Sequence, residues 1–183
     1  MISKNFTTVL SLWAFLSFAF VTGQEVTIIP TGNDLINISY VLGQLEGQPA
    51  VYFEIRAETR GYIGFGFSNQ TCMTNSDAMV TWMDWVTFEL VVQDWTFYTT
   101  GTPYERELDQ QQDWRVESLV WNEDGVSTTL SFVRLYNTGD PVDIIIEDKT
   151  MNLIFSVGEW PALHHHPIGR SGNILFNLIQ GTK

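Results

Sequence analysis

The sequence has a single cysteine, Cys72, and only nine lysine and arginine residues against 21 aspartate and glutamate residues. One cysteine excludes a disulfide bond within the chain, so the fold must be stabilised by its hydrophobic core. The excess of acids gives a formal net charge of −12, and this charge repels nucleic acids and anionic membrane surfaces. We therefore expect neutral ligands or basic proteins as partners, and no nucleic acid.

Long apolar segments are scarce, and none after residue 21 is long enough to span a bilayer as a helix. The apolar residues 9–21 follow Lys4 and precede small residues, which is the arrangement of a secretory signal peptide. We predict a signal peptide over residues 1–23 and one mature domain over residues 24–183. This predicts a secreted, extracellular protein without a transmembrane span.

Two glycosylation sequons, beginning at Asn37 and Asn69, are consistent with secretion and predict a glycoprotein. In an oxidising compartment the lone Cys72 is expected to be buried, capped or paired with another chain. The sequence leaves these three alternatives open.

Strand signals dominate the rest of the chain. Short segments rich in Val, Thr, Tyr, Phe and Trp alternate with Gly, Asn, Asp or Pro, and no helical period follows residue 23. This pattern predicts an all-β fold, an antiparallel, immunoglobulin-like sandwich of about ten strands. The expected strands are residues 35–42, 51–57, 61–67, 78–83, 86–92, 95–99, 114–121, 126–136, 153–157 and 173–179.

Motifs for catalysis by the protein itself are missing. No serine sits in a strand-to-helix elbow, and no CxxC pair or HExxH helix occurs. The GxxGxG of residues 61–66 lies in an expected strand that no helix follows, so it does not predict a phosphate-binding loop. We therefore predict a domain that is not an enzyme by itself.

All three histidines, His164, His165 and His166, stand consecutively between Pro161 and Pro167. In an extended segment His164 and His166 share a side and His165 faces away. Catalytic copper or zinc needs three protein ligands, and no fourth histidine is available. Two interpretations remain. The histidines lie in a solvated loop, or one of them binds a metal together with a soft ligand from a distant part of the chain.

Met73 lies in a polar segment, between threonine and cysteine, that follows the glycine-rich strand of residues 61–67. Packing is the commoner role of a methionine, but a polar loop explains it poorly. A thioether and an imidazole from two loops at one end of the sandwich would form an axial pair for haem iron. Gly64 and Gly66 would let a flat macrocycle lie close to the backbone.

These residues also carry a resemblance to a known family. The chain resembles the DOMON family, which is named from the amino-terminal region of dopamine β-monooxygenase and is related to the cytochrome domain of cellobiose dehydrogenase. The matching motifs are GYIGFGFS at residues 61–68, MxxSDxMV at residues 73–80, TLSFVRLYNTGD at residues 129–140, and NLIFSVGE at residues 152–159 followed by His166-Pro-Ile-Gly-Arg170. The resemblance implies a β-sandwich that binds haem or, in some branches, sugars.

The resemblance also implies the site residues. It places the axial ligands on Met73 and on one of the three histidines, with His166 favoured over His165 and His164. Haem b, held by methionine and histidine, has both axial positions filled and a raised reduction potential, which suits one-electron transfer or haem-dependent redox sensing. Arg170 and Arg134 are candidates to pair with the haem propionates, and a core or surface ion pair is the alternative. The partner would be a redox protein or a small-molecule reductant.

A haem-free module is the alternative function. Seven tryptophans accompany twelve phenylalanines and six tyrosines. Indole faces that are not needed in the core would stack on a carbohydrate or another apolar ligand. A purely adhesive extracellular domain, in which Cys72 links two chains, remains a third alternative.

Overall fold

The computed structural model describes residues 25–71, 73–98, 105–162 and 169–183. These residues form eleven strands in two antiparallel sheets and contain no helix. The predicted all-β sandwich is therefore confirmed. The predictions for the signal peptide, Cys72 and the three histidines lie outside the described residues.

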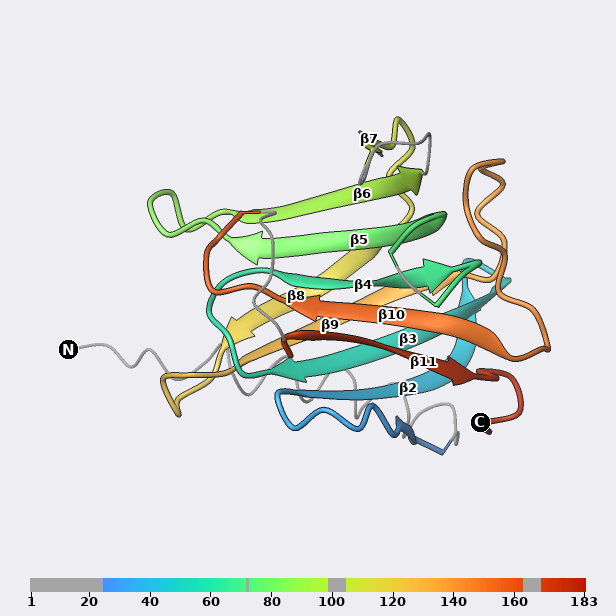
Figure 1. The fold of residues 1–183 in the computed structure, drawn as a ribbon, viewed down its shortest axis with the longest axis horizontal. Helices are drawn as coiled ribbons and strands as arrows, with labels where there is room; N and C mark the ends of the chain where they lie inside the picture. Colours follow the sequence, from blue (N-terminus) through green and yellow to red (C-terminus); the bar gives the residue numbers. More distant parts are fainter. Residues whose placement is uncertain (1–24, 72, 99–104, 163–168) are drawn as a thin grey trace.

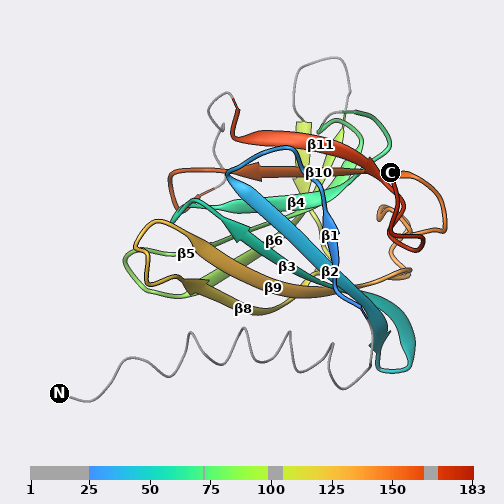
Figure 2. The ribbon, with the colours of Figure 1, turned by 90° about the horizontal axis from the view of Figure 1, so that it is seen from below.

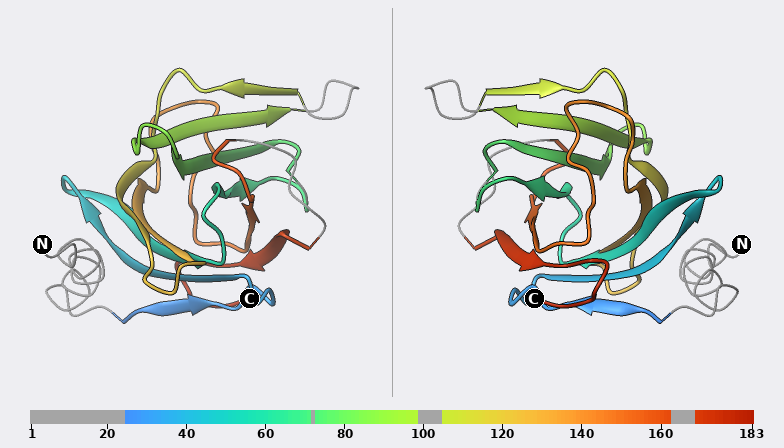
Figure 3. Two further views of the ribbon diagram at one scale, coloured as in Figure 1. Left: turned by 90° about the vertical axis from the view of Figure 1, so that its left-hand side faces the viewer. Right: turned by 90° about the vertical axis from the view of Figure 1, so that its right-hand side faces the viewer.

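The two sheets face each other, as Figures 2 and 3 show. In spatial order, the five-stranded sheet consists of β1 (Thr27–Ile29), β2 (Ile36–Leu45), β3 (Gln48–Ala57), β9 (Thr128–Leu135) and β8 (Arg115–Trp121). The six-stranded sheet consists of β11 (Ser171–Phe176), β10 (Met151–Val157), β4 (Ile63–Ser68), β5 (Ser76–Met83), β6 (Leu90–Tyr98) and β7 (Glu105–Leu108) (Figure 1).

Aromatic side chains fill the space between the sheets. Phe53 on β3 lies 4.9 Å from Phe65 on β4 and 5.1 Å from Phe132 on β9, measured between ring centroids. Trp114 stacks on Phe67 at 5.8 Å. Aromatic pairs of this kind each contribute about 0.5–1.5 kcal/mol beyond the burial of their area. They compensate for the absence of a disulfide within the chain.

The sequence predicts two strands at residues 86–92 and 95–99. The structure has a single strand there, β6, over Leu90–Tyr98, so the predicted bounds are wrong. Residues 86–88 instead belong to the turn between β5 and β6. The edge strands β1 and β7 were not predicted. β7 is polar and exposed along its length, so no alternation of apolar and polar residues marks it.

The strand register fixes where the connecting loops leave the six-stranded sheet. Ser68 and Ser76 pair at one end of the β4–β5 hairpin, so Met73 lies at that end. Val157, the last residue of β10, pairs with Ile63 at the opposite end of β4. The segment that follows β10 therefore leaves from the end opposite to Met73. The two segments expected to carry the ligands therefore start from opposite ends of β4, and the histidines themselves lie outside the described residues.

Among the described residues, no helix is long and apolar enough to cross a membrane.

Candidate cofactor-binding face

The outer face of the six-stranded sheet carries an unusual row of small, buried side chains. Phe65, Phe67 and Met79 point into the core, so the residues that alternate with them point outward. The outward residues at the middle of the three central strands are Gly64 and Gly66 on β4, Ala78 and Val80 on β5, and Ile154 and Ser156 on β10. All of them are buried except Ser156, which is half-buried.

Two cross-strand rows make this face level. Gly66 pairs with Ala78 on one side and with Ile154 on the other. Gly64 pairs with Val80 and with Ser156. Since no large side chain rises from the middle of either row, the sheet presents a flat floor between β10 and β6. We call this surface the outer floor.

Met73 lies on the outer floor. Its half-buried side chain packs against the apolar cluster of Ala78, Phe97 and Ile154, together with Trp95. A thioether, which is a soft and neutral donor, is thus positioned directly over apolar surface. Packing, the alternative that the sequence left open, is therefore the observed role of Met73, and iron ligation is the further role that the resemblance implies for this residue.

Hydrogen bonds within the β4–β5 turn hold the backbone of Met73 in place. The Ser76 hydroxyl donates to the Met73 carbonyl oxygen, and the Ser68 hydroxyl donates to the Thr74 carbonyl at 3.1 Å. Asn75 takes a left-handed backbone conformation with φ of 52°, which asparagine tolerates better than most residues. These contacts close the turn back over the sheet, so that Met73 points onto the outer floor.

Contacts within the protein explain why β4 has glycine at positions 64 and 66. A Cβ atom on Gly66 would collide with the backbone of Asp77 and Ala78 on the neighbouring strand. A Cβ atom on Gly64 would lie 2.6 Å from the Ser156 hydroxyl oxygen. Close approach of the strand backbones therefore explains Gly66 without any cofactor, and the Ser156 side chain occupies the space beside Gly64. The flat floor is a consequence of the same close approach.

The two arginines considered for haem propionates have protein partners instead. Arg170 donates to the backbone carbonyls of Glu58 at 3.0 Å and Val157 at 3.4 Å. Arg134 is fully buried and forms ion pairs with Asp77 and, at 2.9 Å, with Asp143. For Arg134 the alternative of a core ion pair is therefore the observed arrangement.

Arg134 belongs to a buried acidic cluster that sequence reasoning missed. One carboxylate oxygen each from Asp77, Asp94 and Asp143 lies within 4.8 Å of the others. Trp114 donates its indole N–H to Asp94 at 3.1 Å. The three carboxylates have the spacing of metal ligands, but the guanidinium of Arg134 already lies among them. The only sequence signals were an aspartate and an arginine inside apolar strands.

Burial and mutual repulsion raise the pKa values in this acidic cluster. Burial, together with the charge of Asp77, raises the pKa of Asp94 to about 8. The same causes raise the pKa of Asp143 to about 7. Burial also raises the pKa of Asp77, although the neighbouring Arg134 opposes this shift. The cluster therefore holds protons at pH values where exposed aspartates have lost theirs.

The tryptophans divide between packing and exposure. Trp114 lies in the core between the sheets, and Trp82 is buried on the outer face. Trp85 and Trp160 are exposed at the end of the sandwich where β5 finishes. The aromatic surplus is therefore only partly explained by the core, as the alternative function expected.

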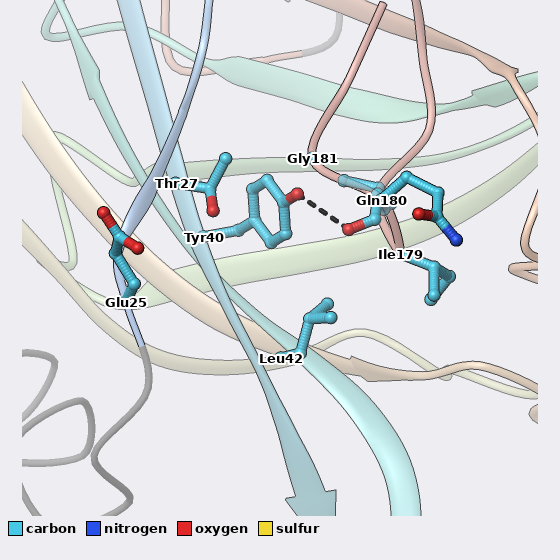
Figure 4. Close-up of a pocket in the computed structure, with 8 residues that line it drawn as sticks. Glu25, Thr27, Tyr40, Leu42, Ile179, Gln180 and Gly181 are labelled. Atoms are coloured by element: carbon cyan, nitrogen blue, oxygen red, sulfur yellow. Dashed lines mark hydrogen bonds between the residues drawn. The ribbon is translucent and has the colours of Figure 1, made fainter.

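A small cavity of about 250 Å³ lies elsewhere, between β1, β2 and the C-terminal segment (Figure 4). Tyr40 projects into it and donates its hydroxyl to the Leu178 carbonyl at 2.7 Å. Burial raises the pKa of Tyr40. None of the predicted site residues lines this cavity, so it adds nothing to a cofactor site on the outer floor.

Comparison with known proteins identifies the class to which this sandwich belongs. The cytochrome domain of Myriococcum thermophilum cellobiose dehydrogenase has the same fold, with a TM-score of 0.55 over 87% of this chain and 84% of that domain. The sequences are 11% identical, so the likeness concerns the fold alone. Residues 39–158 match the DOMON domain family. The chain belongs to the DOMON family, and the resemblance seen in its motifs is confirmed.

Curated relatives give the same family and show its wider context. Human DBH-like monooxygenase protein 1 is 31% identical over 144 residues, which cover 79% of this chain and 21% of that protein. Human dopamine beta-hydroxylase is 29% identical over 140 residues, covering 74% of this chain and 20% of that protein. The chain thus spans about a fifth of the length of these relatives.

Proposed function

We propose that this protein is a secreted, haem-binding DOMON domain that acts in one-electron transfer or haem-dependent redox sensing. The observation that carries the proposal is Met73, a soft donor fixed over a flat and apolar floor. The cytochrome domain that shares the fold supports it. The partner would be a redox protein or a small-molecule reductant, and the domain would not be a catalyst by itself.

The described residues fit a flat, apolar group on three points. Gly64, Gly66 and Ala78 provide a level surface. Ile154 and Phe97 would provide apolar surroundings, and Met73, which packs beside them, would provide one ligand. His166, with His165 and His164 as the alternatives, would provide the other ligand. Bound haem b would supply a one-electron couple, whose potential a Met/His pair raises relative to two histidines.

The positions of the loops set a condition on this proposal. Met73 approaches from the Ser68 end of β4, and the histidine segment starts and finishes at the Ile63 end. Two axial ligands can meet only if both segments extend over the same outer floor. Apart from Ser156, the residues of the floor are apolar and buried, as a covered surface requires.

An absorption spectrum of the purified protein tests the proposal. Protein isolated with haem, or given haemin, is expected to show a sharp Soret band and low-spin α and β bands on reduction. Met73→Leu and His166→Ala are each expected to abolish the low-spin spectrum. Met83→Leu is the matched control, because Met83 packs on the core side of β5.

Two results would contradict the haem proposal. One is a spectrum that is indifferent to both ligand substitutions. The other is a colourless protein that takes up no haemin. If such a colourless protein retains a carbohydrate on a glycan array, the haem-free module replaces the cytochrome as the function.

A further inference from the structure

A cluster of exposed aromatic and apolar side chains marks the end of the sandwich where the β5–β6 turn, residues 84–89, projects. The exposed fractions are 85% for Val86, 66% for Phe88, 58% for Trp160 and 39% for Trp85. Together with Trp121 at the end of β8, these residues form what we call the aromatic tip. Exposed apolar patches of this kind mark interaction sites in soluble proteins.

The aromatic tip is built rigidly. One carboxylate oxygen of Asp84 accepts hydrogen bonds from the backbone N–H groups of Val86 and Thr87, both at 2.8 Å. The backbone of Asp84 is bonded to Phe88 and Glu89 as well. These bonds hold Phe88 in a left-handed conformation with φ of 57°. Backbone strain at an exposed phenylalanine is costly, and the core does not require it.

Ring contacts join the members of the aromatic tip into one surface. The centroids of Trp85 and Trp160 are 5.7 Å apart, and Trp85 donates its indole N–H to the Arg60 carbonyl at 3.1 Å. The guanidinium of Arg60 lies 5.2 Å from the ring centre of Trp121, which in turn meets Phe88 edge-on at 6.3 Å. The apolar groups are therefore positioned before any partner arrives, which reduces the entropy lost on binding.

The charges around the aromatic tip are mostly negative. Four acids lie within two residues of its members in the sequence: Asp84, Glu89, Glu123 and Glu159. The nearby cations are engaged, since Arg60 covers Trp121 and Arg56 pairs with Asp124 at 2.7 Å. Arg170 lies 3.9 Å from Glu159, so three of the four acids remain without a cation partner among the described residues. An acidic border repels anionic lipid, and it would also repel a second copy of the same surface.

We propose that the aromatic tip is a docking surface for a protein partner whose own face presents apolar side chains bordered by arginine or lysine. Trp85 and Trp160 supply the large rigid contacts that dominate interface energies. Their π-faces and the adjacent acids both attract guanidinium groups. The proposal does not invoke haem, because the contacts that form the aromatic tip do not involve the outer floor; Trp160 lies in the segment that also carries the histidines.

Selection from a displayed peptide library tests this proposal. Full-length secreted protein is the bait, and the variant carrying both Phe88→Ser and Trp160→Ser is used for counter-selection. The enriched peptides are expected to contain an apolar or aromatic anchor flanked by Arg or Lys. Their affinity is expected to fall at least tenfold, measured by calorimetry, for Phe88→Ser, Trp160→Ser and Glu89→Lys.

Ile28→Ser is the matched control, because Ile28 is an exposed apolar residue on the edge strand β1; it is expected to leave the affinity unchanged. Each variant is first checked for an unchanged circular dichroism spectrum. The proposal is overturned if peptides bind the variants equally or lack basic residues. It is also overturned if the substitutions abolish a dimer in sedimentation, since that result assigns the surface to a second copy of the chain. Loss of binding to phosphatidylcholine vesicles would overturn it as well, since that result assigns the surface to lipid.

Discussion

Replacing Asp143 with asparagine is expected to stabilise the protein in alkaline solution and not in acid. Asp143 is a buried member of the acidic cluster, and its pKa is raised from an ordinary 3.8 to about 7. Asparagine has nearly the same shape, and its neutral amide removes the repulsion from Asp77. Arg134 keeps its ion pair with Asp77 in the variant.

The sign follows from proton linkage. A carboxyl group whose pKa is raised in the folded chain contributes stability that is fully present below the unfolded pKa of 3.8. That contribution is lost as the pH rises through the folded pKa, because the unfolded chain then ionises more easily. The difference between the two pKa values of Asp143 corresponds to at most about 4 kcal/mol. Since asparagine also gives up the contact between Asp143 and Arg134, we expect a net gain of about 1–2 kcal/mol at pH 8.5.

Urea unfolding at pH 5.5, 7 and 8.5, followed by tryptophan fluorescence, measures this effect. Asp143→Asn is expected to raise the unfolding free energy at pH 8.5 and to change it little at pH 5.5. Asp124→Asn is a control of opposite sign, because hydrogen bonds from Ser127 and Val126 lower the pKa of Asp124. A gain for Asp143→Asn that is equal at all three pH values would refute the assigned charge state of the cluster.

Two further predictions concern the buried ion pair and the packing of the strands. Arg134→Met leaves Asp77 and Asp143 without their cation and is expected to lower the unfolding free energy at pH 8.5 by about 3–5 kcal/mol. The loss is expected to be smaller at pH 5.5. Equal losses at both pH values would contradict the role of the arginine charge. Gly66→Ala drives a methyl group into the backbone of β5 at Ala78. The substitution is expected to lower the unfolding free energy by at least about 1–3 kcal/mol, measured by urea unfolding. An unchanged urea midpoint would show that the strands can separate without penalty.

The strands of the core were predictable because their chemistry is local. The pattern of residues 51–57 or 153–157 shows in one short window that apolar β-formers lie between turn residues. Met79 also has the buried position that its place in an apolar segment predicts. By contrast, β7 lies at a sheet edge, where polar residues are favoured. Its sequence therefore shows no alternation of apolar and polar residues.

Pairings between distant segments were beyond reach of the sequence. That β10 pairs with β4, and not at some other edge, decides from which end the histidine segment leaves. No local pattern carries this information. In the same way, Asp77, Asp94 and Asp143 come from three separate segments, and only the folded register shows that their charges meet. The polar segment around Met73 marks this residue as unusual, but its contacts with Ala78 and Ile154 show only in the structure.

The segment with Met73 and the segment with the histidines leave the sheet at opposite ends of β4. This separation makes the two segments modular. β4 is six residues long, so about 17 Å of rigid sheet separates the two anchor points. Either segment can be lengthened, shortened or exchanged without disturbing the backbone that supports the other. For protein engineers, this allows the residue at position 73 to be varied as a single parameter while the backbone at the opposite end of β4 stays constant.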